Sequence, residues 1–328
     1  MNKKIFASLI LIVSVIGLMY YFPGCSTTDD ILNPETNQIY ANGSLTPVNR
    51  TTVSGNMFVT DQNGNPIQGL DANNITARLR WDAKDTPPDS VLGFVTITQA
   101  TQQNVAGALS MDYSGSMYQQ QIQCMEDAVH AYINSKSATD LAEIIKFSST
   151  VQVMQAFTSD TSLLHTAVNT YFSGTGGSTA LYQSIYQGLL DASGISTSQY
   201  LRTVIAFTDG GENASTITRS TMIDQALTTG IPVFTVTLIA DSNSTAALDM
   251  KNIADTTGGF PFIVDPNNCG VLTNIYQLIN TQLNNAYSIT ITWPSVGLPV
   301  GGTLVTAIVT VTYQGLTATF QRSYNIPY

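Results

Sequence analysis

The strongest constraint on the fold is the alternation of strand-like and helix-like segments from about Asn104 to Ala286. Short apolar runs between turn residues are typical of buried strands, and apolar residues three and four apart are typical of helices. The strand-like runs are Val105–Met111, Leu141–Phe147, Val204–Thr208 and Val233–Ile239. The first helical pattern ends near Ser135. The others are Thr161–Tyr171, Thr179–Ala192, Arg219–Thr229, Ser244–Thr256 and Val271–Asn284. This alternation predicts an α/β fold, a doubly wound and mostly parallel sheet with helices on both faces.

The segments on either side of this region have a different pattern. Thr52–Asp61, Ile75–Trp81 and Leu92–Ile97 lie close together with no helical pattern between them, as do three runs after Ala286. These later runs are Tyr287–Trp293, Leu304–Tyr313 and Leu316–Tyr324. Folded alone, each group would expose a hydrophobic edge. We therefore expect the two groups to pair into one immunoglobulin-like antiparallel β-sandwich, in which the α/β domain is inserted.

The N-terminus has the features of an export signal. Lys3 and Lys4 precede the apolar run Ile5–Phe22, which ends at Pro23-Gly24-Cys25. Gly24-Cys25 resembles the lipobox of bacterial lipoproteins, in which the cysteine carries the lipid. The run is also near the minimum length for a membrane span, so an uncleaved anchor and simple secretion remain alternatives. The polar, weakly periodic stretch that follows predicts a flexible tether.

These patterns divide the chain into five segments. We predict a lipoprotein-type signal peptide at 1–24, a flexible tether at 25–50, the first part of the sandwich at 51–103, the α/β domain at 104–286 and the second part of the sandwich at 287–328. The expected location is the bacterial cell envelope, with a lipid anchor at Cys25 and the outer membrane or cell surface as the site. Formal net charge is −10, and nucleic acid is an unsuitable partner because it requires a basic surface.

Polar residues gather at the predicted ends of two strands. Asp112-Tyr113-Ser114-Gly115-Ser116 follows the first strand run, and Asp209 follows Val204–Thr208. In a doubly wound sheet, ligands bind beyond the carboxyl ends of the strands where the strand order reverses. Carboxylates and hydroxyls are ligands for Mg²⁺, Mn²⁺ or Ca²⁺. The first loop alone could equally be a helix N-cap.

A glycine-rich loop, Gly174-Thr175-Gly176-Gly177-Ser178-Thr179, lies between these two segments in sequence. It opens a helical pattern, with Thr179 in the first turn. Such a loop could instead cradle a phosphate, but the lysine that a P-loop needs is missing.

Together these motifs resemble the von Willebrand factor type A domain and its metal-ion-dependent adhesion site. That site uses an aspartate–x–serine–x–serine loop, a threonine from a second loop and an aspartate from a third. The matching metal ligands in this chain are Asp112, Ser114, Ser116, Thr179 and Asp209. The resemblance covers about Asn104 to Ala286.

The resemblance implies a Mg²⁺ cofactor, or Mn²⁺ or Ca²⁺ in its place. In the family one or both carboxylates act through water, and one coordination position stays open. An under-neutralised hard cation attracts a carboxylate. The implied partner is therefore a protein ligand with an acidic residue.

Catalysis has little support in the sequence. His130 and His165 are the two histidines, and both lie in amphipathic helical patterns, where a surface or packed role is the simpler interpretation. No metalloprotease or serine-hydrolase motif is present. A hydrolase that uses a carboxylate pair stays open, because such pairs form only in space.

Two cysteines remain besides Cys25. In the resembled fold the helices near Cys124 and Cys269 are neighbours, so a disulfide is geometrically possible, and two buried free thiols are the equal alternative. We interpret the chain as an envelope-tethered protein for metal-dependent adhesion. The alternative is a scaffold subunit of an envelope assembly that docks a fixed partner.

Overall fold

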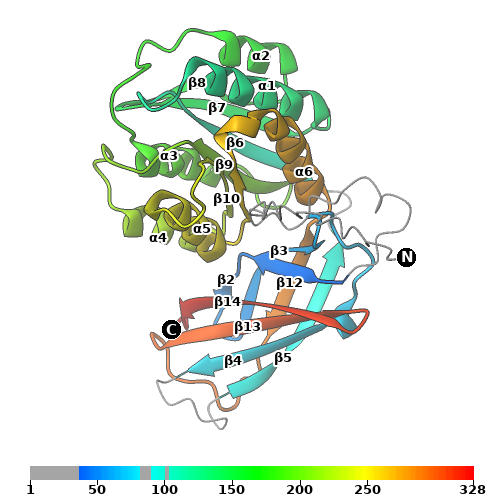
Figure 1. Cartoon of the computed structure of the whole chain (residues 1–328). Coiled ribbons are helices and arrows are strands. Elements are labelled where there is room, and N and C mark those ends of the chain that lie inside the picture. The colour runs from blue at the N-terminus through cyan, green and yellow to red at the C-terminus, as the bar shows by residue number, and fades with distance from the viewer. Residues whose placement is uncertain (1–36, 82–89, 100–102) are drawn as a thin grey trace, which may run out of the picture.

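The computed structural model describes residues 37–81, 90–99 and 103–328, which form an α/β domain and a β unit (Figure 1). The expected signal peptide, Cys25 and the first part of the expected tether lie outside the described residues. Within the described ranges, no helix is long and apolar enough to cross a membrane.

The α/β domain is built on a six-stranded sheet with the order β11-β10-β9-β6-β7-β8. Every pairing in it is parallel except that of β8, which runs antiparallel to β7 at one edge. The strands are β6 (Asn104–Asp112), β7 (Leu141–Phe147), β8 (Val151–Thr158), β9 (Tyr200–Thr208), β10 (Val233–Leu238) and β11 (Pro261–Val264). This is the doubly wound α/β sheet that the alternating pattern predicts.

Helices cover both faces of this sheet because successive strand residues alternate between the two faces. The helices are α1 (Gln119–Ser135), α2 (Thr161–Asn169), α3 (Leu181–Ser193), α4 (Arg219–Thr229), α5 (Thr245–Thr257) and α6 (Leu272–Asn284), with a 3₁₀ segment η4 (Pro266–Val271). Residues of α1, α2 and α6 share one buried cluster with Leu109 and Ile205. Residues of α3, α4 and α5 share another with Ala108 and Val204.

The β unit contains strands from both ends of the chain. They are β1 (Ile39–Gly43), β2 (Thr46–Asn49), β3 (Thr52–Asp61), β4 (Ile75–Trp81), β5 (Ser90–Gln99), β12 (Tyr287–Thr292), β13 (Leu304–Tyr313) and β14 (Leu316–Asn325), with a 3₁₀ turn η2 (Ala72–Asn74). Their order is β1-β3-β12-β5-β4-β13-β14, with β2 paired to β3. The C-terminal strands therefore pair directly with the N-terminal ones. The immunoglobulin-like assignment stays a prediction.

The sheet bends within β5. Gly93 pairs with Ala77 of β4, whereas Phe94 begins the pairing with β12. A Cβ atom on Gly93 would come within 2.5 Å of side-chain atoms of Ile291 and Trp293, so only glycine fits this close approach. The bend encloses one hydrophobic core, and it brings β14 against β1, where the Arg322 guanidinium donates to Asn42 Oδ1.

Part of the expected tether at 25–50 is instead folded. Residues 39–43 form β1 and residues 46–49 form β2, both paired antiparallel with β3. Ile39 and Leu45 are buried in the core of the β unit. These runs are too short and too polar for periodicity to reveal them, and they become strands because β3 offers an unpaired edge.

The two units share a close interface. The rings of Phe58 and Phe234 pack edge to face with centroids 5.3 Å apart. Asn42 Nδ2 donates to the carbonyl of Gly259 at 2.6 Å, and Gln282 Nε2 donates to the carbonyl of Gly64 at 2.8 Å. Since β6 begins shortly after β5 ends, the amino ends of the parallel strands face the β unit. Their carboxyl ends lie at the far end of the α/β domain, about 30 Å away for a nine-residue strand.

Candidate metal centre

The candidate centre lies where the strand order reverses. β6 pairs in parallel with β7 on one side and with β9 on the other. The chain leaves β6 toward β7 and later leaves β9 in the opposite direction toward β10. The loops after β6 and β9 therefore diverge from adjacent strand ends, which leaves a crevice between them. Asp112 is the last residue of β6, and Asp209 directly follows β9.

The loop after β6 is held in shape by its own aspartate. Asp112 is fully buried, and its Oδ1 accepts a hydrogen bond of 2.7 Å from the backbone N–H of Ser114. The hydroxyl oxygens of Ser114 and Ser116 lie 3.2 Å apart. The residue between them is Gly115, so both serine side chains point to the same side of a tight turn.

The loop after β9 closes the other side of the crevice. Ser116 Oγ donates to Asp209 Oδ1 at 2.7 Å, and Thr208 Oγ1 donates to Asp112 Oδ2 at 2.6 Å. One polar cluster thus joins the two aspartates through hydroxyl groups. Asp209 is only half-buried and Ser116 is exposed, so the cluster runs from a buried end at Asp112 to an end that faces solvent.

The glycine-rich loop meets the first loop through the backbone. Gly115 N–H donates to the carbonyl of Gly177 at 2.9 Å, and Gly176 N–H donates to the carbonyl of Tyr113 at 2.8 Å. Gly176 and Gly177 have φ values of 89° and 84°, which are costly for other residues. This conformation allows the backbone to double back on the first loop and places the buried Thr179 just ahead of α3.

Sequence reasoning missed the residues that fix Thr179 and the start of α3. Asn213 Oδ1 accepts from the Thr179 N–H at 2.7 Å, and Glu212 accepts from the Tyr182 N–H at 2.9 Å. These two residues tie the segment after Asp209 to the start of α3. Their place directly after Asp209-Gly210-Gly211 was the one available signal, since a polar run after a strand end commonly binds neighbouring loops.

Burial raises the pKa of Asp112 to about 6, although hydrogen bonds from Thr208 and Ser114 favour the charged form and oppose the rise. Burial also raises the pKa of Asp209. Two carboxylates in one crevice without a nearby cation are electrostatically unfavourable, and a divalent cation would relieve this.

The donor set fits a hard divalent cation. Four of the five predicted ligands, Asp112, Ser114, Ser116 and Asp209, are joined by the contacts above, and the fifth lies in the loop bonded to Gly115. All their side-chain donors are oxygens, as Mg²⁺, Mn²⁺ and Ca²⁺ require. Among the described residues there is no group of three or more His, Cys, Asp or Glu side chains that could hold a metal. A site of two carboxylates and three hydroxyls is consistent with that finding.

The remaining predicted residues lie away from this crevice. Cys124 in α1 and Cys269 in η4 form a disulfide with a Cα–Cα distance of 5.8 Å. It joins α1 to the segment that leads into α6. His130 and His165, expected to be surface or packed residues, contact each other between α1 and α2.

Comparison with known families gives one match. Residues 108–212 match the model of the von Willebrand factor type A domain. This segment runs from within β6 to just beyond Asp209, so it includes all three loops of the candidate centre. The chain therefore contains a von Willebrand factor type A domain. No curated protein matches the chain.

Several solved structures are similar in part. Proximal thread matrix protein 1 from the mussel byssus, with a zinc-occupied MIDAS motif, is 15% identical with a TM-score of 0.46, over 56% of this chain and 48% of that one. An aerotolerance-related membrane protein from Bacteroides fragilis is 16% identical with a TM-score of 0.45, over 55% of this chain and 99% of that one. A von Willebrand factor type A protein from Catenulispora acidiphila is 10% identical with a TM-score of 0.48, over 88% of this chain and 72% of that one.

This chain spans about half the length of the mussel protein. All three TM-scores are below 0.5, so no function is inferred from these likenesses.

Proposed function

We propose that this protein is a binding protein of the bacterial cell envelope that recognises an acidic residue of a protein ligand through a divalent cation. The cation is held by Asp112, Ser114, Ser116, Thr179 and Asp209, with Mg²⁺ as the first choice and Mn²⁺ or Ca²⁺ as substitutes. The main support is the continuous polar cluster that links Asp112 to Asp209 across the switch point.

Each part of the cluster has a role in this proposal. Asp112 is the buried anionic end, and the Ser114 N–H and Thr208 hydroxyl fix the direction of its two oxygens. Ser116 and Asp209 form the solvent-facing end, where an incoming group has access. A divalent cation bound here supplies an electrophilic position that a carboxylate from outside can fill. We infer binding rather than catalysis, because binding a carboxylate through the cation needs no side chain beyond the five ligands.

The position of the centre suits a tethered receptor. The carboxyl ends of the parallel strands lie at the end of the α/β domain opposite the β unit. The chain enters the β unit at its N-terminal strands, ahead of which the proposed lipid anchor at Cys25 lies in sequence. In this arrangement the β unit, with the proposed immunoglobulin-like fold, acts as a spacer, and the binding surface points away from the membrane.

Two measurements on the full-length protein test the proposal. Mg²⁺ should raise the melting temperature by about 5 °C at a concentration about 100-fold above its dissociation constant. Asp112→Ala should abolish this response. Asp224→Ala, which removes an exposed acid on α4, is the matched control and should keep it.

The second measurement is capture of surface proteins from whole cells, with and without a chelator. We expect that the wild-type protein captures a ligand, and that both the chelator and Asp112→Ala prevent this capture. Capture should also require an acidic residue on the ligand. A melting temperature indifferent to Mg²⁺, Mn²⁺ and Ca²⁺, with capture that survives chelation, would contradict the proposal. Capture of one stoichiometric partner regardless of metal would instead favour the scaffold function.

A further inference from the structure

The two histidines of the chain face each other across two helices. His130 lies in α1 and His165 in α2, and their Nδ1 atoms are 2.6 Å apart. Their ring centroids are 4.8 Å apart, with 37° between the ring planes. Both side chains are half-buried, and the contact between the two Nδ1 atoms is partly buried.

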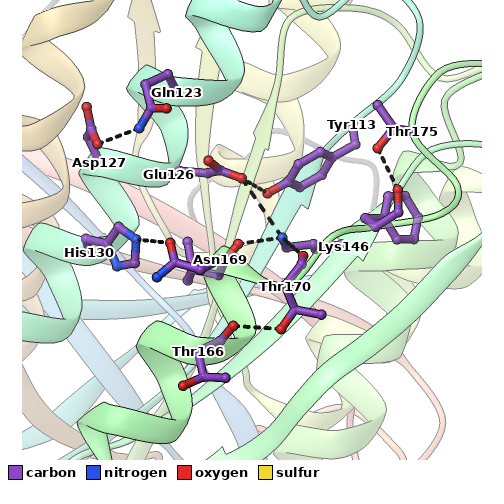
Figure 2. Close-up of polar contacts among 12 residues, drawn as sticks. Tyr113, Gln123, Glu126, Asp127, His130, Lys146, Thr166, Asn169, Thr170 and Thr175 are labelled. Atoms are coloured by element: carbon purple, nitrogen blue, oxygen red, sulfur yellow. Dashed lines mark hydrogen bonds and ion pairs between the residues drawn. The ribbon is translucent and has the colours of Figure 1, made fainter.

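Each histidine is oriented by an asparagine of the opposite helix. His130 Nε2 lies 3.0 Å from Oδ1 of Asn169 in α2, which Figure 2 shows. His165 Nε2 lies 3.0 Å from Oδ1 of Asn134 in α1. The arrangement is reciprocal, so both outer nitrogens meet a carbonyl-type oxygen while both inner nitrogens meet each other.

With the Asn134 and Asn169 amide oxygens facing the rings, the positions of the protons follow. An amide oxygen only accepts, so each Nε2 must carry the hydrogen that it donates. A neutral imidazole with its hydrogen on Nε2 has a lone pair on Nδ1. Two lone pairs therefore point toward each other at 2.6 Å, which is unfavourable unless a positive group joins them.

We propose that the Nδ1 atoms of His130 and His165 form a second metal site, specific for a borderline transition metal such as Zn²⁺, Cu²⁺ or Ni²⁺. Imidazole nitrogen suits these ions, whereas the oxygen-only centre at Asp112 suits hard cations. Ligating histidines commonly donate the other ring N–H to an oxygen acceptor, which is the role of Asn134 and Asn169. The chain thus carries two metal sites of different chemistry.

Coordination requires a small opening of the pair. A tetrahedral zinc ion with Zn–N bonds of about 2.05 Å needs its two nitrogens about 3.3 Å apart. The rings must therefore separate by about 0.7 Å, which rotation of two half-buried side chains can supply. Water or a donor from outside would fill the remaining coordination positions. A bound ion would join α1 to α2.

Zinc titration of the full-length protein, purified through a tag without histidine, tests the site. The background is Asp112→Ala, so that the centre at Asp112 cannot contribute. We expect Zn²⁺ to raise the melting temperature by about 5 °C at about 100-fold above its dissociation constant. Mg²⁺ at the same concentration should have no effect.

Variants assign the response to the pair. His165→Ala and His130→Ala should each abolish it, and Asn169→Ala should weaken zinc affinity about 10- to 100-fold because it removes the orienting oxygen. Thr166→Ala is the matched control, since the side chain of this exposed neighbour on α2 donates to the carbonyl of Ser162 and does not contact either histidine among the described hydrogen bonds. Circular dichroism without metal verifies that each variant is folded.

A spectroscopic measurement gives a direct readout. Electron paramagnetic resonance of the Cu²⁺-loaded protein should show coupling to two imidazole nitrogens, and to none in the double histidine variant. An unchanged melting temperature with Zn²⁺, Cu²⁺ and Ni²⁺ would overturn the proposal. The pair would then be a hydrogen bond between imidazoles, with one asparagine amide turned to donate to its Nε2. Failure here leaves the function proposed for the Asp112 centre intact, because that function is tested with Mg²⁺ in protein that retains Asp112.

Discussion

The α/β domain and the β unit differ in strand direction, and this decides which of them gathers polar groups into a site. In the α/β domain the five parallel strands all end at the same side of the sheet, so residues that follow different strands meet there. In the β unit neighbouring strands run in opposite directions, so their ends alternate between two sides. The candidate centre therefore lies in the α/β domain.

The two units also differ in continuity. The α/β domain is one uninterrupted segment, whereas the β unit combines residues 39–99 with residues 287–325. β12 lies between β3 and β5, in the interior of that sheet. The β unit therefore depends on both ends of the chain, and the two units should respond differently to substitutions.

Fluorescence and circular dichroism separate these responses. Both tryptophans of the chain, Trp81 and Trp293, lie in the β unit, while the α-helices of the described residues lie in the α/β domain. Tryptophan fluorescence therefore reports unfolding of the β unit, and ellipticity at the helical wavelength reports the α/β domain.

The largest effect is expected from removal of the disulfide. It closes a loop of 145 residues within the α/β domain, so Cys124→Ser with Cys269→Ser should cost about 4–5 kcal/mol of unfolding free energy in the chain-entropy model. The helical transition in urea should shift to lower denaturant while the fluorescence transition moves less. Equal shifts of both signals would show that the units unfold as one.

A cavity in β12 should produce the opposite result. Ile291 is fully buried in the β unit, and Ile291→Ala should cost about 2–4 kcal/mol. The fluorescence midpoint should move further than the helical one. Thr292→Ala, at the exposed neighbouring position, is the control and should change neither by much.

A buried carboxyl group gives the α/β domain its own pH dependence. Burial, with the nearby Asp191 carboxyl as a second cause, raises the pKa of Glu143 to about 9. The folded state thus holds this proton more tightly than the unfolded state, so its contribution is lost as pH rises from about 4.5 to 9.

Glu143→Gln should therefore stabilise the α/β domain by about 2–3 kcal/mol at pH 7 and flatten its stability between pH 5 and 9. Urea unfolding followed by ellipticity across that range measures this. Asp224→Asn, at an exposed position, should leave the pH profile as it is. A profile of the Glu143→Gln protein as steep as that of the wild type would contradict this assignment.

The smallest effect is expected at the candidate centre without metal. Because burial raises the pKa of Asp112 to about 6, the unpaired charge destabilises the fold above that pH. Asp112→Asn should stabilise the chelated protein by about 1–2 kcal/mol at neutral pH, since part of the gain is offset by altered hydrogen bonds. The advantage should disappear below about pH 4. A variant less stable than wild type in chelator would refute the idea that the crevice needs a cation.

The parts of the fold predicted from sequence are those with a strong local signal. β3, β4 and β7 have the predicted boundaries, because their apolar runs end at clear turn residues. β1 and β11 were missed, since each is short and forms a strand only through the neighbour it joins. The local sequence pattern carries no information about which neighbouring strand such a segment will join.

The candidate site also has parts that the sequence predicts and parts that it does not. Asp112 and Asp209 are recognisable because each follows an apolar strand in a recurring motif. The roles of Thr208 and Asn213 depend on which loops approach each other, which no spacing reveals. The contact between His130 and His165 joins two residues 35 positions apart in sequence, and it too exists only in the folded chain.

The pairing of Gln99 with Tyr287 has a consequence for the modular construction of this protein. The chain leaves the β unit after Gln99 and re-enters it at Tyr287, at directly opposed residues of two antiparallel strands. The whole α/β domain thus occupies the place of a hairpin loop. Because its two ends meet at one ladder position, a domain of another kind with adjacent termini could be exchanged for it without changing the register of β5 and β12.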